Sequence, residues 1–84
     1  MLTRYRVLDE NDAVIKEGVT PLRLMQDQKG LHVVANIEFR ATTQVTVDCI
    51  EIDIGRRTWI EALTKTLEHD DSIDWTLDVY LTDT

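Results

Sequence analysis

Two segments of this chain alternate between apolar and mostly polar residues, and that pattern restricts the fold more than any other feature. Between residues 31 and 40 the odd positions are apolar and the even positions are mostly polar. Between residues 73 and 82 the same alternation recurs, with Trp75 and Leu77 on the apolar side and Asp74 and Asp78 on the other. A period of two is typical of a strand with one buried and one wet face. The sequence therefore predicts a largely antiparallel sheet that covers one apolar core.

The first quarter of the chain predicts a hairpin. Residues 2–8 and 13–19 read as strands, and residues 9–12 (Asp-Glu-Asn-Asp) have the side chains that favour a turn. Pro21 ends the second strand in this interpretation, because proline cannot donate to a ladder. Residues 21–28 stay open between a short helical turn and an edge strand, and a second turn is expected at Lys29-Gly30.

The segment from residue 45 to 54 changes phase in the middle. Val45 and Val47 are odd-numbered apolar positions, whereas Ile50 and Ile52 are even-numbered. A regular strand cannot point both sets inward, so we expect a β-bulge near Cys49–Ile50. The alternative is a strand whose C-terminal end is buried on both faces.

Residues 58–68 have the local signature of a helix. Thr58 and Glu61 have the spacing of a capping box, and Glu61 and Lys65 form a favourable i,i+4 pair. Trp59, Ile60, Leu63 and Leu67 would form its apolar stripe. We therefore expect one helix here, ended by Asp70-Asp71-Ser72.

These segments predict one α+β domain that spans residues 1–84, in the order β-β-β-β-α-β. Four or five mainly antiparallel strands would form the sheet, and the single helix would cover its apolar face. The expected core consists of apolar residues on the inward positions of these elements: Tyr5, Val7, Ile15, Leu31, Val33, Ile37, Phe39, Val47, Ile50, Ile52, Ile60, Leu63, Leu67, Trp75, Leu77 and Val79.

The net charge of −7 belongs entirely to the second half of the chain. Residues 1–40 contain six basic and six acidic side chains, whereas residues 41–84 contain three basic and ten acidic ones. With a pI near 4.6, repulsion disfavours direct binding to nucleic acid or to an anionic membrane and favours a basic protein partner. The predicted binding surface consists of the acids on the polar sides of the last strands: Asp48, Glu51, Asp53, Asp74 and Asp78.

The residue inventory does not suggest an enzyme. Ser72 is the only serine, the three glycines are scattered, and no neighbour of Cys49 favours a thiolate. No ligand set has the spacing of a metal site, so we expect no catalytic residue, metal or cofactor. The single cysteine is typical of a cytoplasmic protein.

The sequence thus favours a small acidic binding protein of the cytoplasm. Its expected role is to inhibit a basic, nucleic-acid-binding protein by occupying that partner's surface, as a phage anti-defence product would. The alternative is a structural or assembly subunit that associates through an open sheet face or an edge strand, which leaves a homo-oligomer open.

Overall fold

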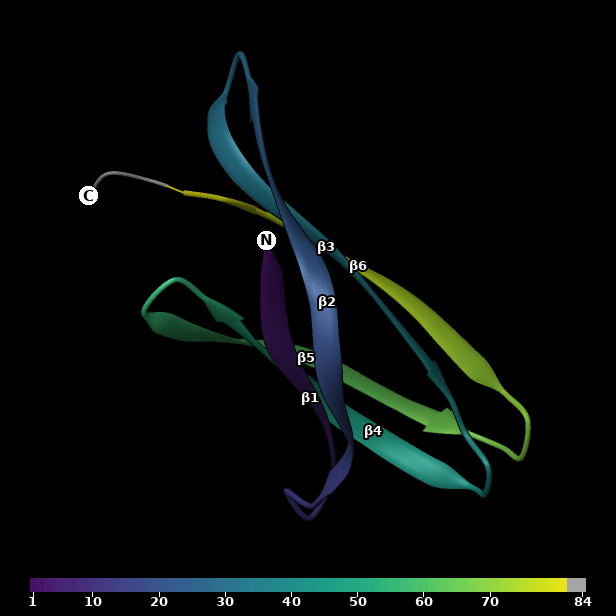
Figure 1. Cartoon of the computed structure of the whole chain (residues 1–84). Helices are drawn as coiled ribbons and strands as arrows, with labels where there is room; N and C mark the ends of the chain where they lie inside the picture. The colour runs from purple at the N-terminus through teal and green to yellow at the C-terminus, as the bar shows by residue number, and fades with distance from the viewer. Residues whose placement is uncertain (82–84) are drawn as a thin grey trace.

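The computed structural model describes residues 1–81, and within them the chain is all-β (Figure 1). Six strands form one antiparallel sheet in the order β5-β4-β1-β2-β3-β6. Their bounds are β1 (Leu2–Asp9), β2 (Val14–Asp27), β3 (Gly30–Arg40), β4 (Val45–Ile54), β5 (Arg57–Leu67) and β6 (Ser72–Tyr80). The predicted α+β class is therefore wrong, and so is the predicted count of four or five strands.

Residues 57–67 form a strand instead of the expected helix. β5 pairs with β4 from Val45↔Leu67 to Ile54↔Arg57. The supposed capping residues have other partners, since the Thr58 hydroxyl donates to Asp53 and the Glu61 carboxylate accepts from the Trp59 indole. Four β-branched residues and a tryptophan favour an extended backbone once a partner strand is present. Pairing with the neighbouring strand decides the conformation of residues 57–67, and that pairing cannot be predicted from the local sequence pattern.

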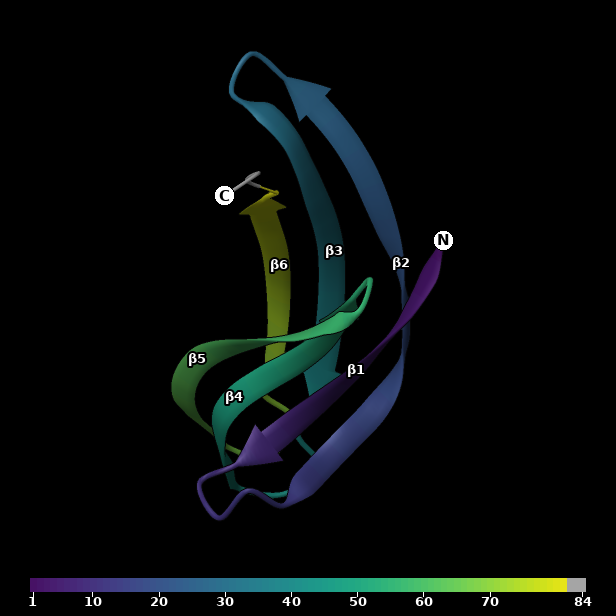
Figure 2. The same ribbon diagram turned by 90° about the vertical axis from the view of Figure 1, so that its left-hand side faces the viewer.

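The undecided residues 21–28 extend β2 instead of forming a helical turn. β2 pairs with β1 up to Pro21 and then with β3 from Leu22 onwards. This long strand is shared by both halves of the sheet, which curls until the two halves face each other (Figure 2). The ends of the curled sheet are β5 and β6.

The bulge predicted from the change of phase in β4 is confirmed, but it lies one residue earlier in the chain than expected. Relative to β1, Cys49 lies opposite Leu8 and Val47 opposite Asp9, so Asp48 is the extra residue. The bulge lets Val47 and Ile50 both point into the core, where they are almost completely buried. Cys49 is partly buried on the other face, opposite Leu8 and Ala62.

Most of the predicted core is buried or packed against the buried cluster. Two expected members are wrong, because Leu31 is 37% exposed and Ile60 is 61% exposed. Ile60 was assigned by helical spacing, and in a strand it lies on the opposite face from Trp59. The core also includes apolar residues that the sequence reading left out: Leu22, Ala35, Ala41 and Ile73.

Candidate functional site

Three of the five predicted acids, Asp48, Glu51 and Asp53, lie on β4. Arginine side chains lie near them. Arg6 of β1 donates through Nε to Glu51 at 2.9 Å and forms an ion pair with the same oxygen. This hydrogen bond raises the pKa of Arg6. The Asp53 carboxylate accepts from the Thr58 hydroxyl at 3.1 Å. Asp48, at the bulge, takes part in none of the side-chain hydrogen bonds or ion pairs found among residues 1–81.

The other two acids lie on β6, and both are hydrogen-bonded to β3. Asp74 accepts from the Asn36 amide at 2.7 Å. Asp78 lies 2.5 Å from Nδ1 of His32. These carboxylates therefore help to hold β6 against β3, in addition to any role they have toward a partner.

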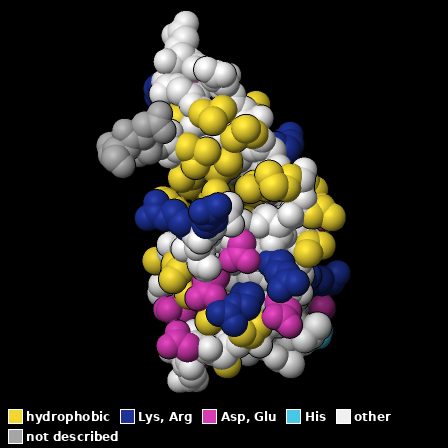
Figure 3. Space-filling model, turned by 60° about the vertical axis from the view of Figure 1, so that its left-hand side comes forward, with side chains coloured by type: hydrophobic (Ala, Val, Ile, Leu, Met, Phe, Trp, Pro, Cys, Tyr) yellow, Lys and Arg dark blue, Asp and Glu magenta, His cyan; other side chains and the backbone are white. Residues whose placement is uncertain are grey.

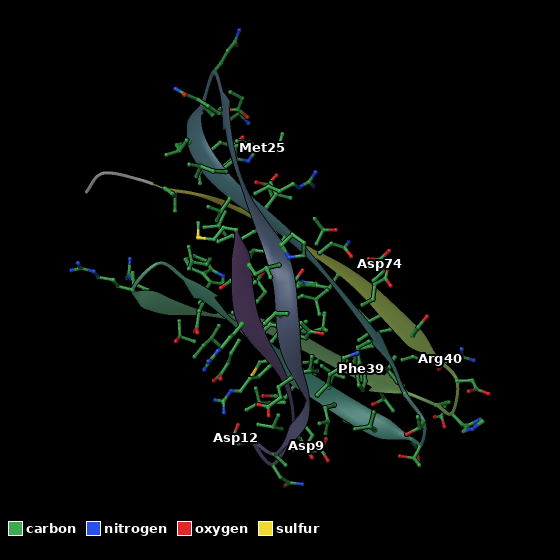
Figure 4. All side chains as sticks on the ribbon, viewed as in Figure 1. Asp9, Asp12, Met25, Phe39, Arg40 and Asp74 are labelled. Carbon is green, nitrogen blue, oxygen red and sulfur yellow. The ribbon has the colours of Figure 1, made fainter. Side chains whose placement is uncertain are left out.

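The five acids fall into two groups because of the strand order. β4 and β6 are separated in the sheet by β1, β2 and β3. Figure 4 shows Asp74 on β6 far from Asp12, which lies beside the β4 group at the β1–β2 turn. The expectation of one continuous acidic surface across these strands is not met by this topology.

Two shallow grooves lie on the β4 side. One, of about 620 Å³, is lined by Asp12, Asp48 and Glu51 together with the apolar side chain of Ile60. The other, of about 510 Å³, brings Arg4 and Arg6 together with Glu17 and Asp53. Both grooves mix charges or combine acids with apolar side chains, so neither presents the uniform row of negative charge that a nucleic-acid duplex does.

A histidine that the sequence did not single out is one of two buried polar side chains among residues 1–81. His32 is only 7% exposed, and its ring stacks on Tyr80 with centroids 4.6 Å apart. Asp78 bonds one ring nitrogen, and Asp27 lies 3.8 Å from the other. The Tyr80 hydroxyl donates to Asp27 at 2.5 Å, so four side chains join β2, β3 and β6. Period-two alternation predicts that these four side chains lie on the outer face, but it cannot predict that they contact one another.

Replacing Tyr80 by phenylalanine should flatten the dependence of stability on pH at both extremes. The hydrogen bond to Asp27 raises the pKa of Tyr80 from 10 to about 12 and lowers the pKa of Asp27 below 3.8. A raised tyrosine pKa stabilises the fold below pH 10, and this contribution is lost as the pH rises toward 12. A lowered aspartate pKa stabilises the fold above pH 3.8, and this contribution is lost as the pH falls through the folded value.

The melting temperatures of both proteins should therefore be measured from pH 3 to about pH 11. The wild-type protein should exceed Tyr80→Phe by a constant margin at intermediate pH, and the margin should shrink at both ends. A margin that does not change with pH would contradict the assigned hydrogen bond.

Cys49 is not arranged as a nucleophile. Burial, followed by the charges of Asp48 and Glu51, raises the pKa of its thiol above the usual value of 9. A thiol that stays protonated at neutral pH is a weak nucleophile.

The sequence reading missed an exposed apolar surface on the inner face of the sheet. Leu24 lies opposite the core residue Val33, yet it is 61% exposed. Leu31 is joined to Leu81 by a backbone hydrogen bond of 2.8 Å, and Leu81 is 41% exposed. In Figure 3 hydrophobic side chains gather on the upper part of the visible face, above a region where charges of both signs alternate. Alternation identified the inward side of these strands, but it could not predict that the other described residues leave their outer ends exposed.

The described residues hold no group of three or more potential metal ligands and no helix that could cross a membrane. A scan against family models, a search of curated proteins and a search of solved structures each found no match to this chain.

Proposed function

We propose that this chain is a non-enzymatic binding domain that associates with protein through the open side of its sheet. The observation that carries the proposal is the apolar surface that remains exposed between the two halves of the sheet. Its exposed members come from four different strands or their ends: Leu24, Leu31, Trp59 and Leu81. A contiguous apolar surface on a small domain usually marks an interface.

The two terminal strands add main-chain binding capacity to this surface. Among the described residues, β5 pairs only with β4 and β6 pairs only with β3. Each terminal strand therefore presents unpaired N–H and C=O groups along one side, which can accept a further strand. Edges and apolar surface lie on the same open side, so one partner could cover both.

The acidic surface supports a second candidate function, the inhibition of a basic protein by occupation of its nucleic-acid-binding surface. The groove beside Asp12, Asp48 and Glu51 favours it, because Asp48 has no internal partner among the described residues. The intramolecular bonds of Glu51, Asp74 and Asp78 weigh against it, since a satisfied carboxylate has less to gain from a partner. For either candidate we place the protein in the cytoplasm, because its only cysteine is unpaired.

A capture experiment with three baits separates the candidates. The full chain, an apolar variant (Leu24→Gln with Leu31→Gln) and an acidic-surface variant (Asp48→Lys with Asp74→Lys) would be immobilised and exposed to lysate of the cells that make the protein. We expect a captured protein that survives about 1 M salt, where charges are screened beyond about 3 Å, and that the apolar variant loses. Circular dichroism would confirm that both variants are folded.

The opposite pattern selects the second candidate. A partner that is lost at high salt and by the acidic-surface variant, but kept by the apolar variant, would replace the open side with the acidic surface as the interface. A chain that neither captures a partner nor associates with itself would contradict both.

A further inference from the structure

The first five residues of β5 form a segment that is complementary to itself. Arg57-Thr58-Trp59-Ile60-Glu61 begins with a positive charge, ends with a negative charge and has its tryptophan in the middle. We infer that two copies of this chain pair through this segment, antiparallel, about a two-fold axis at Trp59. The inference rests on the proposed function and names a second copy as the partner of the open side.

The register of this pairing matches charges and apolar groups. With Trp59 opposite Trp59 of the second copy, Arg57 lies opposite Glu61 of that copy, and the same pair recurs on the other side of the axis. In an antiparallel pair, directly opposite residues project to the same face. Arg57, Trp59 and Glu61 lie opposite Ile54, Ile52 and Ile50 of β4, so all three share the inner face of the sheet. Two ion pairs would thus flank one aromatic pair.

The residues involved are available for such contacts. Trp59 is 38% exposed and Ile60 is 61% exposed, although both are large apolar side chains on a sheet edge. Among the described residues, Glu61 is hydrogen-bonded only through Oε2, to the Trp59 indole at 3.0 Å, so its Oε1 can accept from a guanidinium. Ile60 shares the groove on the outer face with Leu8 and Cys49.

Two alternative pairings that also oppose charged residues are disfavoured by charge. A β5 pair centred on Glu61 would oppose Arg57 to Lys65, and the bulge between Ala62 and Lys65 would interrupt its ladder. A β6 pair centred on Thr76 would oppose Asp74 to Asp78 twice. Like charges directly opposite one another destabilise a strand pair, so both of these registers are less favourable than the one about Trp59, which brings opposite charges together twice. A two-fold dimer is also the commonest symmetric assembly.

Sedimentation velocity over a concentration series tests the charge register. We expect the wild-type chain to dimerise, and both Arg57→Glu and Glu61→Arg to weaken dimerisation at least about tenfold, because each variant creates two like-charge contacts. The charge-swapped double variant Arg57→Glu/Glu61→Arg should restore the dimer. Glu10→Arg, which changes the net charge as Glu61→Arg does but lies in the exposed β1–β2 turn, is the matched control for that variant and should leave the dimer unchanged.

Disulfide trapping tests the position of the axis without relying on charge. In a Cys49→Ser background, Trp59→Cys places two thiols opposite each other on the axis, at a Cα separation that suits a disulfide. Mild oxidation should link this variant into a dimer, whereas Thr66→Cys in the same background should stay monomeric because it lies beyond the bulge.

A wild-type chain that stays monomeric at millimolar concentration, or a dimer indifferent to both single charge reversals, would overturn the inference. So would failure of the charge swap to restore the dimer in a folded protein, or equal cross-linking at positions 59 and 66. If these tests fail while the apolar variant still loses a captured partner, the open side binds a different protein and the proposed function stands.

Discussion

Leu77→Ala should destabilise the protein by about 2–5 kcal/mol, the range measured for removal of a large aliphatic side chain from a core. Leu77 is only 2% exposed and faces Ala35 across the β3–β6 pair, where the small alanine leaves no side chain to refill the space. A domain of this size has a free energy of unfolding of only about 5–15 kcal/mol, so the loss is a large share of the total. Urea unfolding followed by tryptophan fluorescence measures it directly.

Leu24→Ala is the matched control for this variant. The same side-chain atoms are removed, but Leu24 is 61% exposed, so the free energy of unfolding should change by less than about 1 kcal/mol. Equal losses for the two variants would mean that Leu24 is covered in solution. A small loss for Leu77→Ala would mean that β6 does not contribute to the cooperative core.

His32→Ala should lower the free energy of unfolding by about 1–3 kcal/mol, which is the second largest effect that we expect. The variant removes a hydrogen bond to the Asp78 carboxylate and the stacking contact with Tyr80. We place the cost below that of a fully buried ionic contact because Asp78 is half exposed and can be hydrated when its partner is gone. Thermal unfolding at neutral pH is the appropriate measurement.

His69→Ala provides the comparison for His32→Ala. Within residues 1–81, the one polar partner found for the His69 side chain is the exposed carboxylate of Asp70 at 3.1 Å, and the His69 side chain is 71% exposed. Its removal should therefore shift the melting temperature hardly at all. If the two histidine variants melt at the same temperature, the cluster around His32 does not stabilise the junction of β2, β3 and β6.

Strand alternation predicted much of this fold because each strand carries its own pattern. Residues 31–40 and 73–80 form strands with the expected inward sides, and the phase switch of β4 corresponds to a real bulge at Asp48. In these segments the local preference for an extended chain and the burial of one face agree, so neighbouring strands did not have to be known.

The same reasoning failed for β5 because its local signals are ambiguous. A capping box, an i,i+4 ion pair and a helical stripe can all be found in residues 58–67, but the same residues include a tryptophan and four β-branched side chains, which favour a strand: Trp59, Thr58, Ile60, Thr64 and Thr66. Short apolar segments fit both periods, and the choice is made by the strand beside them. β4 offers that partner over the full length of β5.

The candidate surfaces were predicted only in part. The acids of β4 and β6 do lie on polar faces, as the alternation indicated, but their separation follows from a strand order that places β1, β2 and β3 between them. The His32 cluster joins residues 27, 32, 78 and 80, and the exposed apolar surface includes residues 24, 31, 59 and 81. Sequence proximity carries no information about either arrangement.

By itself the sequence determined that this chain forms a sheet with one apolar face, where that sheet is irregular, and that its negative charge resides in the second half. Each of these properties depends on residue type and on spacing within a single segment. Only the tertiary structure decided that residues 57–67 extend a sheet rather than cover it, and that the sheet ends at β5 and β6 with part of its inner face exposed. Those outcomes depend on which strands become neighbours, and that is set by the simultaneous burial of side chains distant in sequence.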